Sequence, residues 1–485
     1  MTKFVVNSDR IIGTRDDKIY GQFIEHFHRI VYGGIYDPNS SLSDEHGLRL
    51  DVLAALKKIK VPVIRWPGGC FVSAYDWKKG VGSKRIPYFD KAWRVEESNE
   101  FGTDEFLNFS EMVGAEPYIC ANAGTGTPEE ISDWVEYCNL ENQGIWAKER
   151  IKNGHAAPYK VKYWSVGNEN YGSWEIGAKS PAEWGRYVKE AVKMMKRVDP
   201  TIEVMAANVV DLDWNIQLLK EAGDVIDWIS IHGYWDPIHQ ENNPASYETV
   251  IAQIPTIEEH IRKAECFIGT FGYTDKIKIA FDEWNLRGWH HPNIHRGHGY
   301  TVDEYLTPRD LNDLNQTYTV ADAVFSASFL NCCLRHCNTV KMANFAPTVN
   351  VRGAIYTHAN GIVLRPTYHV FDLFVNYMGD RVVDSYTNDS CKDIDMVATI
   401  CRNGAIAISL VNLNCDQSSP IQMEIPNICG KTAVLHTLNG ATKDSYNDLG
   451  AENCVVITEG NRRVLDGNSI KLELACHSVN VLVIE

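Results

Sequence analysis

Residues 161–209 contain three runs in order: VKYWSVGNEN (161–170), SPAEWGRYVKEAVKMMKRV (180–198) and EVMAANV (203–209). The first and last runs are short and rich in apolar, β-branched and aromatic residues, which is typical of buried strands. The middle run opens with a capping box that has proline in its first turn, and its apolar residues recur every third or fourth position. A strand, an amphipathic helix and a second strand predict a parallel β–α–β unit.

The same alternation extends over three quarters of the chain. Strand-like runs flank this unit on both sides: KIYGQFIEHF from residue 18, VPVIRWPGG from 61, EPYICANAG from 116, IDWISIHGY from 226, KIKIAFDEWN from 276 and VKMANFAP from 340. Together with the first two they make eight, and eight parallel units of this kind close a barrel. We therefore expect an α/β fold, with a (β/α)8 TIM barrel over residues 15–380.

The pattern changes after about residue 380. AIAISLVNL from residue 405, SIKLELA from 469 and SVNVLVIE from 478 are strand-like, are separated by turn residues and lack amphipathic helices between them. This predicts a β-sandwich domain over residues 381–485. The strand-like stretch within residues 1–14 has no helix after it, so we expect it to join the sandwich.

Composition excludes several classes of partner. The net charge of −16, without a basic stripe, argues against nucleic acid. No apolar run approaches the ~20 residues of a membrane helix, and the first residues lack the apolar core of a signal peptide. The thirteen cysteines are scattered without CxxC pairs, which favours free buried thiols over disulfides and a cytoplasmic protein.

Two carboxylates end the fourth and seventh predicted strands, Glu169 in GNEN and Glu283 in FDEWN. Functional side chains of such barrels project from the carboxyl ends of the strands, so these two face each other across one mouth. Glycoside hydrolysis needs a protonated and an ionised carboxyl group on either side of the scissile bond. We expect burial and a neighbouring anion to raise the pKa of Glu169, the general acid/base, and we expect Arg65, Tyr234 and His232 to hold Glu283 ionised as the nucleophile.

Other strand ends supply groups suited to binding a sugar, because aromatic rings cover its apolar faces and polar side chains bond its hydroxyls. The candidate substrate-binding residues are Glu25, Arg65, Trp66, Cys70, Asn168, His232, Tyr234 and Trp289, with Asn122 also at a strand end. Asp282 points the other way along its strand and is expected to be a structural partner.

Other readings of these residues are less favoured. Either glutamate alone could be the partner of a surface cation, but two at the ends of opposite strands indicate a catalytic pair. Cys70 is not expected to be a nucleophile, because no Cys-His-Asn order accompanies it. His290, His291, His295 and His298 match no zinc pattern, so we expect no metal.

At these residues the chain resembles the α-L-arabinofuranosidases of glycoside hydrolase family 51, whose clan carries its acid/base and nucleophile on strands 4 and 7. The resemblance rests on IYGQFIEHFHRIVYGGIY, VIRWPGGCFVSAYDW, NAGTGTPEEISDWVEYCN, YWSVGNENYGSWEIG, SIHGYW, FDEWN and VKMANFAPTVNV, in the family's order. It implies a barrel with a β-sandwich, no cofactor, and hydrolysis with retention of the anomeric configuration. It also implies a homo-oligomer, commonly a hexamer. It also implies that Glu25, Cys70, Asn168 and Tyr234 contact the furanose, with Asn168 near the 2-hydroxyl.

The sequence departs from the family pattern in two places. Pro347 stands where the family has a sugar-binding glutamine, and LRGWHHPNIHRGHG replaces a segment close to V-W-Y-H. We hypothesise that a group from residues 287–298, with His290 or His291 preferred, reaches the sugar in place of the glutamine; alternatively, water fills the gap.

The sequence thus predicts a retaining, exo-acting α-L-arabinofuranosidase that releases terminal arabinofuranose from an oligosaccharide or small glycoside. Two alternatives stay open: a hydrolase of another sugar (a galactofuranoside, xyloside or glucoside), and a sugar-binding protein without turnover. The paired carboxylates argue against the second, because a binder does not need both.

Overall fold

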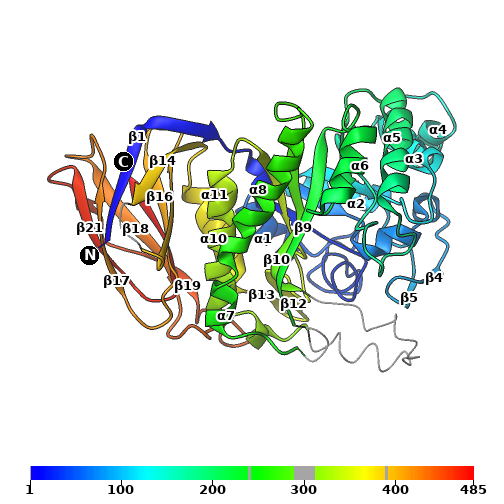
Figure 1. The fold of residues 1–485 in the computed structure, drawn as a ribbon. Coiled ribbons are helices and arrows are strands. Elements are labelled where there is room, and N and C mark those ends of the chain that lie inside the picture. The colour runs from blue at the N-terminus through cyan, green and yellow to red at the C-terminus, as the bar shows by residue number, and fades with distance from the viewer. Residues whose placement is uncertain (1, 239–241, 289–311, 388–390) are drawn as a thin grey trace.

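Eight parallel strands close into a barrel beside a β-rich domain (Figure 1). The computed structural model describes residues 2–238, 242–288, 312–387 and 391–485. Each barrel strand begins within a run predicted from the sequence, which confirms the barrel. In spatial order the strands are β2 (Gly21–Phe23), β3 (Val63–Trp66), β6 (Glu116–Ala121), β7 (Tyr163–Val166), β8 (Glu203–Ala207), β9 (Trp228–Pro237), β10 (Lys278–Gly288) and β11 (Val340–Phe345).

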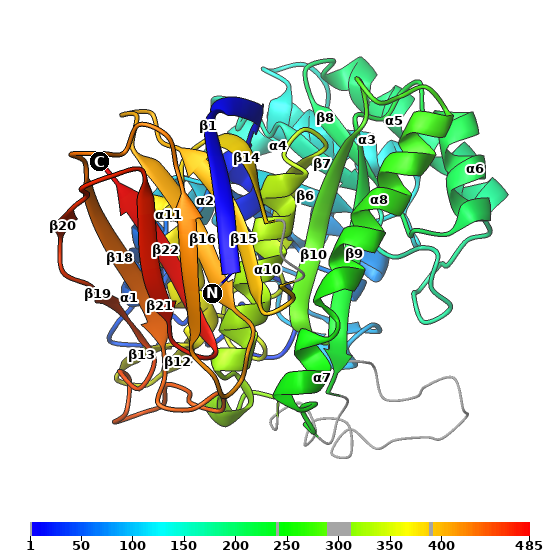
Figure 2. The ribbon, with the colours of Figure 1, turned by 60° about the vertical axis from the view of Figure 1, so that its left-hand side comes forward.

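Helices cover the outside of the barrel (Figure 2). Their starts follow from local sequence: Thr127 caps α3 by accepting the Glu130 N–H at 3.2 Å, and the Glu130 carboxylate accepts the Thr127 N–H at 2.8 Å. The helices in the described part of the chain are α1 (Leu50–Lys58), α2 (Thr103–Val113), α3 (Pro128–Asn139), α4 (Trp146–Lys152), α5 (Pro181–Val198), α6 (Leu212–Ala222), α7 (Tyr247–Ile251), α8 (Ile254–Thr270), α10 (Val320–Arg335) and α11 (Pro366–Tyr377).

The interior of the barrel has an apolar floor and a polar layer above it. Side chains alternate along a strand, so residues two apart point to the same side. Arg65, Ser230 and Asp282 each lie two positions after a residue of the floor, and each is 1 % exposed or less. The strands therefore place a buried charged layer directly below the mouth of the barrel. The floor consists of Val63, Tyr118, Tyr163, Met205, Trp228, Ala280 and Met342.

The β-rich domain is a ten-stranded sheet that includes the N-terminal strand. β1 (Thr2–Thr14) pairs antiparallel with β14 and parallel with β17. One apolar cluster takes side chains from both ends of the strand order, so the sheet folds over into two layers. The boundaries at residues 14 and 380 stay a prediction. The other strands are β14 (Arg381–Thr387), β15 (Ile394–Ile400), β16 (Ile406–Asn412), β17 (Ser419–Glu424), β18 (Thr432–Asn439), β19 (Val456–Glu459), β20 (Arg463–Val464), β21 (Ser469–Leu474) and β22 (Ser478–Ile484).

The thirteen cysteines all lie in the described part of the chain, and all are free. Five of them are buried as expected, whereas Cys266, Cys429 and Cys454 are exposed. Among the described residues, none of the helices has both the length and the apolar character needed to cross a membrane.

The N-terminal strand offers a direct test of the two-layered sheet. Phe4 is 2 % exposed within the shared cluster, whereas Ile11 on the same strand is 49 % exposed. Phe4→Ala should lower the free energy of unfolding of this domain by about 3–5 kcal/mol, because it leaves a cavity. Ile11→Ala should change it by less than about 0.5 kcal/mol. Urea unfolding of both variants checks this, and equal midpoints would show that β1 is not part of the core.

Candidate active site

Two carboxylates lie close together at the mouth of the barrel. Glu169 follows β7, and Glu283 is in β10, where the register with β9 shifts between Ala280 and Glu283 and re-aims the side chain. An oxygen of Glu169 and an oxygen of Glu283 lie within 4.8 Å of each other. The structure therefore brings together the predicted pair.

The turn after β7 is backbone-constrained. Glu169 has φ +45°, which is unusual for a residue with a side chain. Two residues earlier, Gly167 has φ +74°, and a Cβ there would lie 2.0 Å from Asn170 Oδ1. Glycine is required at this position, so the Gly-Asn-Glu sequence fixes where the Glu169 side chain begins.

Glu283 accepts one hydrogen bond on each carboxylate oxygen. Arg65 Nη1 donates to Oε1 at 2.5 Å, and the Tyr234 hydroxyl donates to Oε2 at 2.8 Å. Arg65 also donates through Nη2 to Asn168 Oδ1 at 2.8 Å. The contacts expected for Glu283 from Arg65 and Tyr234 are thus present, and the same guanidinium orients Asn168.

Glu169 binds a histidine and an indole. His232 Nδ1 lies 2.8 Å from Glu169 Oε1, and Trp174 Nε1 donates to Oε2 at 2.9 Å. Burial favours neutral Glu169, but the hydrogen bond and charge of His232, together with Trp174, outweigh it and lower the pKa of Glu169. The expected raised pKa is therefore wrong for the free protein, because the nearest partner of Glu169 is a cation rather than an anion.

His232 lies among three carboxylates. Its Nδ1 is 3.6 Å from Glu283 Oε2, and its Nε2 is 3.3 Å from Asp282 Oδ1. Burial opposes a charged imidazole, but Glu283, Asp282 and Glu169 outweigh it and raise the pKa of His232 to about 10. The mobile proton of the free site therefore resides on His232 at neutral pH.

Asp282 lies below the carboxylate pair with no exposed surface. It accepts hydrogen bonds from the Tyr118 hydroxyl at 2.7 Å and the Ser230 hydroxyl at 2.5 Å, and its Oδ2 lies 3.3 Å from Arg65 Nε. Burial raises its pKa, but Arg65, His232 and Ser230 outweigh this and lower the pKa of Asp282 to about 2. Asp282 contacts Arg65 and His232 and so has a structural role. The expectation that it points away from the site is wrong, because the register shift between Ala280 and Glu283 lets both Asp282 and Glu283 point into the barrel.

Glu25 lines the other side of the mouth. Its Oε1 accepts hydrogen bonds from the Phe71 N–H at 3.1 Å and from Trp93 Nε1 at 3.0 Å. Burial and the charge of Glu283 raise the pKa of Glu25 to about 8, so Glu25 is neutral at pH 7. Trp93 lies in the turn between β4 (Tyr88–Asp90) and β5 (Val95–Glu97), an insertion without a sequence signal, and was not predicted.

Cys70 and Glu175 complete the surroundings of Glu169. The Cys70 Sγ, an oxygen of Glu175 and an oxygen of Glu169 lie within 4.8 Å of one another. Burial and the charge of Glu169 raise the pKa of Glu175 to about 8. Trp174 and Glu175 both lie in NENYGSWEIG, the segment after β7, but loop side chains carry no periodic signal and neither was predicted.

Two residues that were predicted to bind the sugar, Trp66 and Asn122, do not face the active site. A third, Trp289, lies outside the described residues. Trp66 is fully buried between the barrel and α2, stacked on Phe106 at 4.8 Å, and its Nε1 donates to His26 Nε2 at 3.0 Å. Its assignment to the sugar site is therefore wrong, because its position on β3 turns it outward. Asn122 also has a structural role. Trp289, like His290 and His291, lies outside the described residues.

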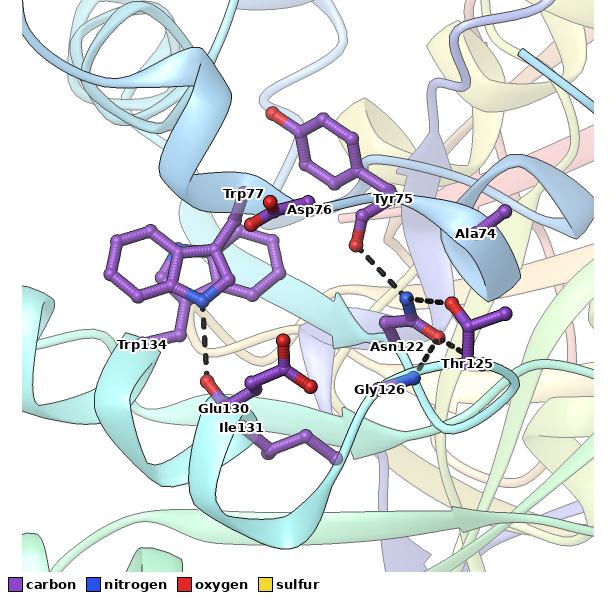
Figure 3. Close-up of a pocket in the computed structure, with 10 residues that line it drawn as sticks. All are labelled: Ala74, Tyr75, Asp76, Trp77, Asn122, Thr125, Gly126, Glu130, Ile131 and Trp134. Carbon is purple, nitrogen blue, oxygen red and sulfur yellow. Dashed lines mark hydrogen bonds between the residues drawn. The ribbon is translucent and has the colours of Figure 1, made fainter.

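Figure 3 shows the separate pocket in which Asn122 lies. The Asn122 side chain donates to the Tyr75 carbonyl and the Thr125 hydroxyl, and its oxygen accepts the N–H groups of Thr125 and Gly126. These hydrogen bonds use both the nitrogen and the oxygen of the Asn122 side chain to hold the loop in shape. The pocket is lined by Ala74, Tyr75, Asp76, Trp77, Asn122, Thr125, Gly126, Glu130, Ile131 and Trp134.

Comparison with known proteins identifies the family. Residues 55–251 match the α-L-arabinofuranosidase 1 domain, and residues 282–478 match the α-L-arabinofuranosidase C-terminal domain. A probable α-L-arabinofuranosidase C of Aspergillus clavatus is 33% identical, over 94% of this chain and 92% of that protein. An intracellular exo-α-(1→5)-L-arabinofuranosidase of Halalkalibacterium halodurans is 37% identical, over 77% of this chain and 74% of that protein.

Solved structures agree over the whole length. An α-L-arabinofuranosidase from Thermotoga maritima, in complex with arabinose, matches with a TM-score of 0.89 at 34% identity, covering 100% of this chain and 99% of that one. The family 51 enzyme from Thermotoga petrophila matches with the same TM-score and identity, covering 100% of both chains. Barrel, β-rich domain and sequence all agree with these proteins, and the chain belongs to the α-L-arabinofuranosidases of glycoside hydrolase family 51.

Proposed function

We propose that the protein is a retaining, exo-acting α-L-arabinofuranosidase in which Glu283 is the nucleophile and Glu169 the general acid/base. The observation that carries this is the carboxylate pair, with oxygens within 4.8 Å of each other. Retaining enzymes hold their carboxyl groups about 5–5.5 Å apart, whereas inverting enzymes leave about 6.5–9.5 Å for a water. The close approach favours double displacement.

In the first step a Glu283 oxygen attacks the anomeric carbon. The glycosidic bond breaks with its electron pair going to the leaving oxygen, which takes a proton from Glu169. Each Glu283 oxygen keeps a lone pair free beside its hydrogen bond from Arg65 or Tyr234. In the second step Glu169 takes a proton from water, the resulting oxygen attacks the anomeric carbon, and the bond to Glu283 breaks.

The proton for the leaving oxygen comes from the pair formed by Glu169 and His232. In the free site this proton is on His232, whose Nδ1 is 2.8 Å from Glu169. A bound sugar excludes water around Glu169, which favours its neutral form, and the proton then passes across this short bond. His232 is thereby assigned as a proton store rather than a sugar ligand.

Several side chains are available to the furanose. Asn168 Nδ2 is buried and has no hydrogen-bond partner among the described residues, which suits a sugar hydroxyl. Glu25, neutral at pH 7, can donate its O–H to another hydroxyl, and Cys70 borders the same space. The Trp174 indole is 45% exposed while bonded to Glu169, and it offers an apolar face to the leaving group.

A second candidate function differs from the first only in the sugar that the enzyme prefers. Pro347 is buried directly after β11, in the position of the family's glutamine, and has no amide to offer. A hydrolase of a related furanoside or pyranoside on the same scaffold is therefore the alternative. We further propose that the protein is cytoplasmic and acts on short arabino-oligosaccharides, supported by relatives from Halalkalibacterium halodurans and Bacillus subtilis that are named intracellular exo-α-(1→5)-L-arabinofuranosidases. A homo-oligomer is proposed on the family resemblance alone.

Removal of the acid should separate substrates by leaving group. Glu169→Ala should reduce kcat about 10²–10⁴-fold on arabino-oligosaccharides, and much less on dinitrophenyl arabinofuranoside, whose leaving group needs no proton. Azide should restore turnover and give a glycosyl azide of retained configuration. Glu190→Ala, on the exposed face of α5, is the matched control and should keep full activity. Equal losses on both substrates would contradict the acid role of Glu169.

The pH profile should report Glu25. Below pH 8 its carboxyl is neutral and can donate a hydrogen bond, and above pH 8 it ionises and loses that donor. The kcat/KM of the wild type should therefore fall as pH rises through about 8. Glu25→Gln stays neutral, so its alkaline limb should move up toward pH 10, where His232 loses its proton. An alkaline limb that is identical in the two proteins would show that Glu25 does not control it.

A further inference from the structure

A second group of metal-ligating side chains lies on the outer helices, on different elements from the active site. Cys332 is in α10, and His336 caps the end of that helix. Glu258 is in α8, which packs against α10 (Figure 1). The Cys332 Sγ, a His336 ring nitrogen and a Glu258 carboxylate oxygen all lie within 4.8 Å of one another.

The histidine is held in the orientation that a metal ligand needs. His336 Nδ1 lies 3.0 Å from Glu265 Oε1, and this oxygen also accepts the Thr339 hydroxyl. Because a carboxylate only accepts, Nδ1 carries the hydrogen, and Nε2 on the other side of the ring is the nitrogen that can bind a metal. There Nε2 lies 3.7 Å from Glu258 Oε1. A carboxylate that orients a ligating histidine in this way is a common feature of zinc sites.

The donor set and the spacing suit Zn²⁺. Bonds of about 2.0–2.1 Å at a tetrahedral angle place a ligating nitrogen and oxygen about 3.3 Å apart, close to the separation seen here. One sulfur, one imidazole and one carboxylate leave the fourth position for water. Cys332 is 2 % exposed, whereas the Glu258 side chain is 35 % exposed, so an ion can enter from the Glu258 side.

The neighbouring charges permit a cation. Arg262 binds Glu258 Oε1 at 2.5 Å, but its side chain is 70 % exposed and can turn into solvent. The Arg335 guanidinium lies against the Cys332 thiol, and it is already paired with Asp395 of β15 at 2.7 Å, which offsets its charge. Glu265 adds a further negative charge. Burial raises the pKa of the Cys332 thiol to about 12, and an incoming Zn²⁺ would form the Zn–S bond while the thiol proton leaves to water.

We propose that Glu258, Cys332 and His336 form a Zn²⁺ site that links α8 to α10. The end of α10 is already tied to the β-rich domain, because Asn331 and Arg335 both bond Asp395. A metal here joins a barrel helix to the helix that contacts the second domain, and its role is to stabilise rather than to catalyse. The sequence did not predict this, because a cysteine and a histidine four residues apart match no zinc pattern until the distant Glu258 joins them.

Two other clusters with the same spacing belong to the active site, Cys70 with Glu169 and Glu175, and Glu169 with His232 and Glu283. A metal bound there would block the carboxylate pair and inhibit turnover. A metal bound between α8 and α10 should leave the hydrolysis of nitrophenyl arabinofuranoside unchanged. The activity of the loaded protein therefore distinguishes the two locations.

The test is a titration of the full-length, chelator-treated protein with Co²⁺, followed by displacement with Zn²⁺. The wild type should bind one Co²⁺ per chain with a thiolate charge-transfer band and intense tetrahedral d–d bands. Zn²⁺ in about 100-fold excess over its Kd should raise the Tm by a few degrees. Cys332→Ser should abolish the charge-transfer band, and Glu258→Gln, at a half-exposed position, should weaken binding at least 10-fold.

Cys266→Ser is the matched control, since Cys266 is an exposed thiol on α8, and it should bind like the wild type. Absence of a thiolate band in the wild type would overturn the proposal. Unchanged Zn²⁺ affinity in both Cys332→Ser and Glu258→Gln would do the same. Binding that inhibits hydrolysis and is lost in Cys70→Ser would place the metal at the active site instead.

Discussion

The geometry of the active site depends on the Arg65 guanidinium, which has no exposed surface. A buried charge is tolerated only where opposite charges and hydrogen bonds surround it. Arg65 meets this requirement with Glu283 and Asp282 on β10 and Asn168 after β7. Removal of either carboxylate would leave buried charge uncompensated, and removal of Asn168 would leave a buried N–H unpaired. One cation therefore fixes the relative positions of the two strand ends that carry the carboxylate pair.

The second constraint is the number of protons in the site. Glu169, Glu283 and Asp282 surround one imidazole, and this excess of negative charge holds a proton on His232 in the free protein. In the proposed mechanism, the proton for the leaving group is therefore held on His232, next to Glu169, in the free protein. Glu25 and Glu175, whose pKa values rise to about 8, stay neutral at pH 7 and do not add to the repulsion. We propose that a bound sugar excludes water from Glu169 and so moves this proton to Glu169, where the leaving group needs it.

The sequence predicted what periodicity and strand ends encode. The eight strands, the place of the N-terminal strand and the approach of Glu169 to Glu283 follow from hydrophobic patterns and barrel geometry. The direction of a side chain at the end of a strand was harder to predict from the sequence. Trp66 ends β3, but its side chain points outward into the helix layer. Residues of insertions and loops, such as Trp93 and Trp174, have no periodic signal. The lowered pKa of Glu169 depends on which neighbour is nearest, and only three-dimensional distances decide that.

In the proposed mechanism, Glu283 becomes covalently attached to the sugar. This attachment is tested most directly by incubating Glu169→Ala with dinitrophenyl arabinofuranoside, so that the first step proceeds and the second is slow, followed by peptide mass spectrometry. We expect the peptide containing Glu283 to gain the mass of one anhydropentose, with the modification on that side chain. A modification on any other residue, or an unmodified protein that releases product of inverted configuration, would contradict it.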